Sequence, residues 1–415
     1  MTGIRYLCKI IYKKFNRMNT IEIHNFGPIE AGYDGAMPIY PVTIFCGDQG
    51  AGKSTIAKLI SMFTWMEKAF VRGDVAMNKK AESTAFLRQR MEYHRIQNYL
   101  RPDSELHFTG IRYIFHYSGG EFSIEEKGAE VDYPMPKIMY IPAERNFLTV
   151  VEHPDTLKEI PDSLFVLFSE YDKARKALKR DIMLPINGFS YHYDKLNNMS
   201  WLMGDGFKVR MSEAASGFQS LIPMTLVTRY ITHIIRVGGQ ASTNLQVNNA
   251  IEKRIATILA DNSIDENMRR LLISQQSALL TYGKFVNIVE EPEQNLFPTA
   301  QRSVLFDLFE AYNDRKDNQL IITTHSPYLI DYTSLAVKAF SIRTKTDVQE
   351  ATLNQIVPKS SRMNGDDVCV YQIRGGKIFA LDKYDNMPSD NNFLNKELSD
   401  TNDLFGRLLE LEDGV

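Results

Sequence analysis

The chain has 415 residues, of which 44% are hydrophobic and 24% are charged, as is ordinary for a globular protein of one large or two modest domains. Its formal net charge of −3 excludes attraction of nucleic acid by the whole molecule, so any DNA contact must come from a local basic patch. No apolar run approaches the roughly 18–20 residues of a membrane helix, and the three cysteines lack metal-ligand spacing; we therefore expect a cytoplasmic protein with no membrane contact and no zinc site.

Residues 1–17 combine basic side chains with apolar stretches that are too interrupted for a secretory signal. One interpretation is a helix that lies on a membrane surface. The other is a disordered lead-in, or a gene start placed upstream of Met18. We favour the second and expect an N-terminal extension.

A strand, a glycine-rich loop and a helix follow in direct succession. After an expected strand over 19–26, the apolar run 42–46 predicts a buried strand, and residues from Thr55 onward have the apolar spacing of a helix. The loop between them fits G-x-x-x-x-G-K-[ST] without a gap and consists of Gly47, Asp48, Gln49, Gly50, Ala51, Gly52, Lys53 and Ser54. Such a loop wraps a polyphosphate with its N–H groups pointing inward. Lys53 would reach the β- and γ-phosphates, and the Ser54 hydroxyl would bind Mg²⁺.

The next part of the chain predicts a sheet beside the nucleotide. A helix is expected over 76–100, and the pattern then changes to a period of two. Residues 105–117 and 121–124 predict antiparallel strands that are joined at a Ser-Gly-Gly turn. Residues 137–141 predict another strand, which ends in a polar loop over 142–146, where open α/β sheets place ligand-contacting loops.

The densest basic run lies in a helix that is expected over 155–183. Its cations are Lys173, Arg175, Lys176, Lys179 and Arg180. A DNA or partner contact is one interpretation, and a solvated helix face is the one we favour. Residues 186–211 are strand-like. Ser216 and Gly217 then open a helical run whose N–H groups could bind an anion, and 249–280 predicts two more helices.

Two acids follow a second buried strand. Residues 285–289 predict that strand, and Glu290 and Glu291 come directly after it. One carboxylate can hold Mg²⁺, directly or through water, and the next can orient a water. After a helix over 297–311, residues 320–324 predict a strand that ends at His325, close to the expected γ-phosphate. This order predicts a parallel core.

The C-terminal part predicts short strands over 336–343 and 368–382 and an acidic helix or frayed end from Asp400. No long heptad array is present in the sequence.

In order and spacing, these segments resemble the ABC-type ATPase heads of the SMC, Rad50 and RecF group. The closest likeness, over roughly residues 18–345, is to stand-alone AAA ATPases related to the OLD family. The segments that carry it are 47–54 (Walker A), 216–219 (signature), 290–298 (Walker B with D-loop), 324–327 (switch histidine) and 140–145, which is similar to that group's segment near the Q-loop.

The resemblance implies an enzyme that binds ATP with Mg²⁺ and hydrolyses ATP between two heads. Lys53 and Ser54 would bind phosphate and Mg²⁺, and Glu290 would stand at the metal position. Glu291 would polarise the attacking water, and His325 would contact the γ-phosphate.

The signature segment would act across the interface between heads, through Ser216 and Gly217 of the opposite subunit. This sequence departs from the family pattern in three places. Glu290 replaces the commoner aspartate, Phe218 replaces the second glycine of S-G-G-Q, and no Q-loop glutamine stands out.

The resemblance implies an α/β fold, with a mixed or parallel P-loop core sheet, an antiparallel β subdomain and a helical signature lobe. The expected segments are an extension (1–17), a P-loop half with the antiparallel sheet (18–151), a helical signature lobe (152–280), a Walker B and switch-histidine core (281–345), and a segment that completes the head or binds a partner (346–415).

The partner is inferred from what the chain lacks. Residues 346–415 are short for a Toprim nuclease, and no convincing nuclease pattern is present. The likeness to PtuA-type ATPases of prokaryotic anti-phage systems implies a homodimer or higher oligomer with a separate effector, an H-N-H nuclease or toxin. The alternative is a RecF-like repair ATPase that binds DNA directly. A third reading, a transporter subunit, is disfavoured by the missing S-G-G-Q.

Overall fold

The computed structural model describes residues 18–128, 132–151, 160–186, 188–239, 245–261, 269, 272, 276 and 280–412. The expected extension over 1–17 and most of the second helix expected within 249–280 lie outside these residues.

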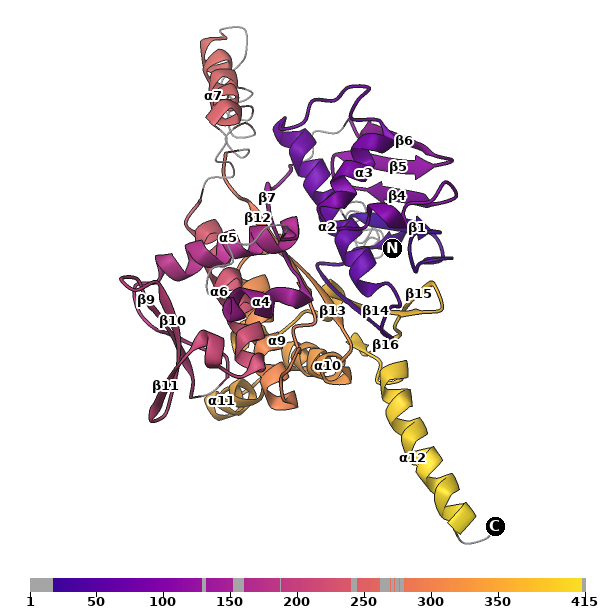
Figure 1. Ribbon diagram of the computed structural model, residues 1–415, viewed down its shortest axis with the longest axis vertical. Coiled ribbons are helices and arrows are strands. Elements are labelled where there is room, and N and C mark those ends of the chain that lie inside the picture. Colours follow the sequence, from indigo (N-terminus) through magenta and orange to yellow (C-terminus); the bar gives the residue numbers. More distant parts are fainter. Residues whose placement is uncertain are drawn as a thin grey trace.

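Six strands form the central sheet in the order β15-β14-β3-β13-β12-β7 (Figure 1). All neighbours are parallel except β15, which is antiparallel to β14. Strands β3 and β12 are buried at every position, as expected where both faces of a parallel sheet are covered. The bounds are β3 Val42–Gly47, β7 Pro136–Ile141, β12 Lys284–Glu290, β13 Gln319–Thr324, β14 Val368–Arg374 and β15 Lys377–Ala380.

Successive residues of β3 face two different hydrophobic cores. Ile44 packs in the core that contains helices α6, α9 and α10. Phe45 packs in the core that contains α2. Since side chains alternate along a strand, the central sheet separates the two cores. The bounds of the helices are α2 Lys53–Arg72, α6 Ser216–Arg236, α9 Pro298–Asn313 and α10 Pro327–Ser341.

A five-stranded antiparallel sheet, in the order β2-β1-β4-β5-β6, covers α2 (Figure 1). The Phe63 ring of α2 lies 5.2 Å from Phe108 and 5.7 Å from Phe115, measured between ring centroids. The single strand predicted over 105–117 is divided into two, because the chain turns at residues 110–112 and β4 and β5 pair as antiparallel strands. At this turn the Glu67 carboxylate accepts hydrogen bonds from the backbone N–H groups of Arg112 and Tyr113. The bounds are β1 Thr20–His24, β2 Met37–Pro38, β4 Glu105–Thr109, β5 Tyr113–Ser118 and β6 Glu121–Glu126.

The lobe that carries the start of α6 contains a small sheet as well as helices. Its strands are antiparallel and lie in the order β11-β10-β9-β8. The bounds are α4 Phe147–Val150, α5 Asp162–Ala177, β8 Ile182–Met183, β9 Ser190–Asp194, β10 Met199–Gly204 and β11 Phe207–Arg210. The mixed α/β fold that was expected, with a mostly parallel core and a separate antiparallel sheet, is confirmed.

Two further sequence predictions of local structure are wrong. Residues 336–343 are not a strand, because most of them continue α10, which Pro327 begins. The buried positions Leu329, Ile330, Thr333, Ala336 and Val337 recur at helical spacing. The helix predicted over 76–100 is α-helical only at α3, Thr84–Glu92.

The remaining elements are α7 Leu245–Ala260, α11 Asp347–Ile356, β16 Lys383–Tyr384, β17 Met387–Pro388 and α12 Phe393–Glu412. Helix α12 projects from the body of the molecule (Figure 1, yellow). Within the described part of the chain, no helix is both long and apolar enough to cross a membrane.

Candidate functional site

The glycine-rich loop connects β3 to α2 in a tight turn. Gly50 and Gly52 have φ angles of 77° and 109°, in the left-handed region that L side chains rarely adopt. A Cβ atom on Gly52 would also lie 2.5 Å from Cδ1 of Ile29. Asp48, Gln49 and Gly50 are exposed at the top of the loop. The loop therefore needs its glycines and leaves its backbone accessible to a ligand.

Lys53, the first residue of α2, folds back over this loop. Its Nζ donates to the main-chain carbonyls of Gly47 and Asp48 at 2.8 Å each. It lies 3.4 Å from Nδ1 of His325. An ammonium group has three N–H donors, so the protein itself engages all of them. Burial lowers the pKa of Lys53, and the Glu291 carboxylate opposes that shift.

His325 follows the end of β13 and stands between a cation and a carboxylate. Burial lowers the pKa of His325, and the charge of Lys53 lowers it further, so the ring is neutral at pH 7. Since Lys53 can only donate, Nδ1 accepts and the proton resides on Nε2. Nε2 lies 3.6 Å from Oε1 of Glu291. Thus Lys53, His325 and Glu291 form one line of contacts at the carboxyl edge of the central sheet.

Glu290, the last residue of β12, is buried and held by two donors. The Tyr140 hydroxyl donates to Oε1 at 2.5 Å, and the Ala143 N–H donates to Oε2 at 3.1 Å. Burial raises the pKa of Tyr140, and the Glu290 carboxylate raises it further, so this hydroxyl keeps its proton. Each carboxylate oxygen has two lone pairs and retains one for a metal ion or its water.

Glu291 has a left-handed backbone, with φ of 44°. This conformation is costly for a residue with a side chain and persists only where its surroundings impose it. The Glu291 N–H donates to the carbonyl of Thr323 at 2.8 Å, which ties the residue to the end of β13. The kink directs the Glu291 side chain toward His325 instead of continuing the strand.

Arg145 is a fully buried part of the site whose role was not predicted from the sequence. Its Nη1 donates to the carbonyl of Glu290 and its Nη2 to that of Glu291, both at 2.6 Å. Its Nε donates to the carbonyl of Ser220 in α6 at 3.0 Å. Burial lowers the pKa of Arg145 to about 10, so the group stays charged at pH 7. The signal in the sequence was a cation in the polar loop that follows the strand over 137–141.

Glu293 is the second residue whose role was missed. Its Oε1 accepts from the Thr324 hydroxyl and from the His325 N–H, both at 2.7 Å. Its Oε2 is buried and has no hydrogen-bond partner among the described residues. Burial raises the pKa of Glu293 although both donors lower it. Glu293 therefore fixes the backbone of His325. Its place in the Glu-Glu-Pro-Glu run was the available signal.

The signature segment contacts a different part of the site. Ser216 begins α6 and is exposed. A Cβ atom on Gly217 would lie 2.6 Å from the carbonyl oxygen of Asn295, so α6 starts directly against the chain that follows Glu293. Phe218 turns away into the lobe, with its ring 4.6 Å from that of Phe189. Within the described residues, neither Ser216 nor Gly217 hydrogen-bonds to the glycine-rich loop.

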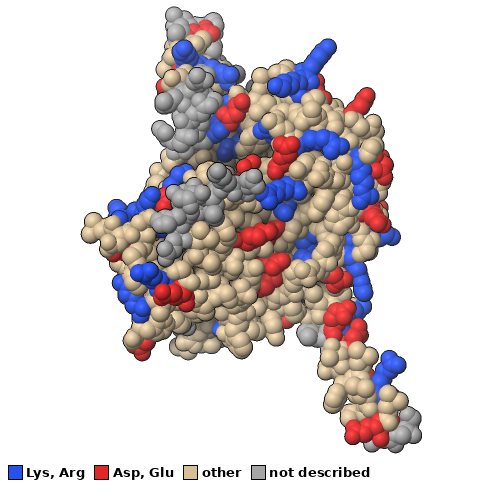
Figure 2. All heavy atoms as spheres, viewed as in Figure 1, with Lys and Arg blue, Asp and Glu red and all other residues tan. Residues whose placement is uncertain are grey.

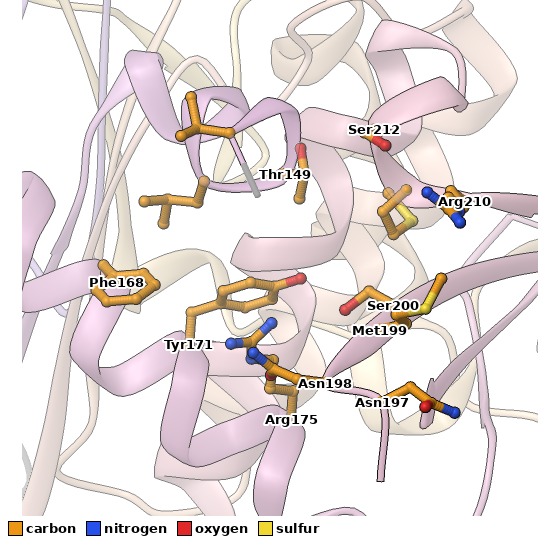
Figure 3. Close-up of a pocket in the computed structure, with 13 residues that line it drawn as sticks. Thr149, Phe168, Tyr171, Arg175, Asn197, Asn198, Met199, Ser200, Arg210 and Ser212 are labelled. Carbon is orange, nitrogen blue, oxygen red and sulfur yellow. The ribbon is translucent and has the colours of Figure 1, made fainter. Parts of the chain in front are cut away.

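A cavity of about 320 Å³ lies in the same lobe (Figure 3). In the figure, the Tyr171 hydroxyl points into it from α5 and Ser200 faces it from β10. Met211 and Ser212 line it, and the carbonyls of both accept hydrogen bonds from Nε2 of Gln219. The cavity thus adjoins the start of α6 and contains none of the predicted catalytic residues.

Three of the five cations of the basic run at 173–180 form ion pairs with acids on their own helix. Lys173 pairs with Glu170 at 3.1 Å, while Arg175 and Lys176 pair with Asp172 at 2.7 and 2.6 Å. Figure 2 shows acidic and basic side chains intermixed over the visible face. These contacts favour the solvated helix face over a DNA-binding surface.

Comparison with known proteins gives one family match, limited to part of the chain. Residues 268–330 match the model of the AAA ATPase domain, and this segment holds Glu290, Glu291 and His325. No curated protein matches the chain. The match and the loop geometry support an ATPase.

Solved structures of SMC heads are similar at low identity. One is an SMC head bound to the C-winged-helix domain of ScpA (10% identity, TM-score 0.39, covering 89% of this chain and 98% of that chain). Another is the SMC head from Thermotoga maritima, at 10% identity and a TM-score of 0.35. That match covers 89% of this chain and 99% of that chain. A third, derived from Pyrococcus furiosus, is an Smc head with an extended coiled coil bound to the C-terminal domain of ScpA, at 11% identity and a TM-score of 0.36. That match covers 88% of this chain and 96% of that chain.

Proposed function

We propose that this protein binds ATP with Mg²⁺ at the glycine-rich loop, hydrolyses it, and uses it to control a separate effector in anti-phage defence. The observation that carries the ATPase part is the line of contacts from Glu291 through His325 to Lys53. It joins the acid that follows β12 to the cation of the phosphate-binding loop, although these residues are far apart in the sequence.

The loop fits a polyphosphate. Asp48, Gln49 and Gly50 are exposed, and a phosphate oxygen can replace His325 Nδ1, the longest of the three contacts of Lys53. Ser54, the second residue of α2, and Glu290, with its remaining lone pairs, are the residues that would hold Mg²⁺. When bound, the ion would neutralise phosphate charge.

Hydrolysis requires a base next to the terminal phosphate. We assign that role to Glu291, whose half-exposed carboxylate is held by a kinked backbone at the carboxyl edge of the sheet. The neutral His325 can donate from Nε2 to Glu291 or to a phosphate oxygen. Glu293 and Arg145 keep both residues in position.

Closure of the site by a second subunit is part of the proposal. Ser216 is exposed at the start of a 21-residue helix, where N–H groups and the helix dipole attract an anion. Ser216 and Gly217 of one copy would cover the ATP held by another, so the protein would work as a homodimer or higher oligomer.

The exposed face of α12 supports a protein partner. Five large apolar side chains on this projecting helix are mostly solvent-exposed, namely Leu404, Phe405, Leu408, Leu409 and Leu411. A helix with an uncovered apolar stripe usually packs against another protein. We assign this face to the effector, a nuclease or toxin encoded by a neighbouring gene.

The test is purification of tagged Glu291→Gln protein with ATP and Mg²⁺ from cells that carry its native neighbouring genes. We expect a stoichiometric second protein that is lost when Leu404→Asp and Leu408→Asp are combined. The number of plaques that phage form on the same cells should rise when Lys53→Ala is introduced. Recovery of DNA without a protein partner would instead favour the RecF-like repair ATPase.

A further inference from the structure

A second cavity, of about 430 Å³, lies beside β7, an edge strand of the central sheet. It is bounded by α2, α3, β7 and the start of α5. Three cations line it, Lys68, Arg90 and Lys137, together with the rings of Trp65, Tyr93, His94, Tyr140 and Tyr282. None of these residues belongs to the glycine-rich loop or to the line of contacts described above.

Two of the three cations have no carboxylate partner among the described residues. Lys137 pairs with Glu170 at 2.9 Å. Lys68 is 9% exposed, and its described contact is the Tyr282 ring, 5.1 Å from Nζ. Arg90 lies over the rings of Trp65 and Phe86, and its buried Nε finds no hydrogen-bond partner in the part of the chain that the structure describes.

The surroundings make the charge of Lys68 costly. Burial, together with the neighbouring charges of Arg72 and Lys137, lowers the pKa of Lys68 to about 7, although the charge of Asp74 opposes the shift. His94 is also buried beside them, and its Nδ1 has no partner among the described residues. Glu92 and Asp162 border the cavity, but neither pairs with Lys68 or Arg90. Buried charges are normally paired, but neither Lys68 nor Arg90 forms an ion pair with a carboxylate within the described residues.

We propose that this cavity is a binding site for a small organic oxyanion, a phosphate ester or carboxylate, whose charged group contacts Lys68 and Arg90. The aromatic walls would enclose its organic part, and the volume suits a small molecule. An oxyanion would supply acceptors that Lys68 Nζ and Arg90 Nε do not find among the described residues.

The site is connected to the proposed metal position. The Tyr140 ring lines the cavity while its hydroxyl donates to Glu290. His94 also lines the cavity and packs edge-on against Tyr140, with ring centroids 4.6 Å apart. A bound anion would therefore lie next to Tyr140, whose hydroxyl orients Glu290. This regulatory step rests on the proposed ATPase function, whereas the binding step does not.

Trp65 allows binding to be measured without ATP. The chain has two tryptophans, so Trp201→Phe leaves Trp65 as the sole indole, at the wall of the cavity. We expect phenyl phosphate to change its fluorescence saturably and uncharged phenol not to do so. Lys68→Met should raise the dissociation constant at least about tenfold, which corresponds to about 1.4 kcal/mol. Lys176→Met, on the exposed face of α5, should leave it unchanged.

Further controls separate this site from the glycine-rich loop. Lys53→Ala should keep phenyl phosphate binding; its loss there would place the anion at the loop and overturn the proposal. An unchanged dissociation constant in Lys68→Met, or equal binding of phenol, would overturn it as well. If Lys68→Met fails to fold, Arg90→Met takes its place. Phenyl phosphate should alter ATP hydrolysis in the parent protein and not in Lys68→Met. If neither protein hydrolyses ATP, the fluorescence titrations still test the binding site, because they do not depend on ATP.

Discussion

The guanidinium of Arg145 donates to the main-chain carbonyl of Glu291 at 2.6 Å and so holds a residue with a left-handed backbone. The same group holds the carbonyls of Glu290 and of Ser220 in α6. One side chain therefore joins the end of β12, the candidate base and the helix that carries the signature segment.

Replacement of Arg145 by methionine should destabilise the protein strongly, because it leaves several buried carbonyls without donors. We expect a loss of about 3 kcal/mol or more in the free energy of unfolding, measured by urea titration. The control is Arg236→Met, which removes a surface ion pair with Asp314 and should cost less than about 1 kcal/mol. Equal effects of the two changes would contradict the role of Arg145.

Glu291→Gln should bind ATP normally and hydrolyse it about 10²–10⁴-fold more slowly, since the amide cannot accept the proton of the attacking water. Single-turnover hydrolysis and ATP binding measured on the same preparation would separate the two effects. Full hydrolysis by this variant would assign the base to another residue.

Lys53→Ala should weaken ATP binding by about 2 kcal/mol, roughly 30-fold, because it removes a charged hydrogen-bond donor from the phosphates. Isothermal titration with ATP and Mg²⁺ measures the change. Lys58→Ala, on the same helix but outside the loop, is the matched control. ATP affinity that survives the loss of Lys53 would place the nucleotide elsewhere.

Glu293→Ala should slow hydrolysis and destabilise the fold by about 1–3 kcal/mol, because the Thr324 hydroxyl and the His325 N–H lose their acceptor. Glu293→Gln keeps an acceptor oxygen and should restore most of both properties. If alanine and glutamine behave alike, Glu293 does not position His325 through these hydrogen bonds.

His94 should make stability depend on pH. Burial lowers its pKa to about 3 in the folded protein, whereas an exposed histidine titrates near 6.5. The unfolded chain therefore takes up a proton first as the pH falls, so stability is lost from about pH 6.5 downward. His94→Phe should remove up to one proton from this dependence, about 1.4 kcal/mol per pH unit. Urea titrations at several pH values measure the slope, and identical slopes would contradict the assignment.

The sequence by itself determined the elements whose signals are local. The loop from Gly47 to Ser54 could be read because glycines, a preceding apolar strand and a following helix lie within a short stretch. Glu290, Glu291 and His325 could be expected near the loop, because parallel strands bring their carboxyl ends to one edge of a sheet.

Only the tertiary structure decided what depends on which elements pack together. The apolar run over 336–343 fits a strand or a buried helix equally well, and packing against α9 makes it helical. Arg145 and Lys68 are ordinary cations in the sequence. Strands and helices that are distant in the chain enclose both residues. Arg145 is thereby buried where it binds the Glu290 carbonyl, and Lys68 is buried in the wall of a cavity. The burial of these two side chains depends on long-range contacts, which a local sequence pattern does not predict.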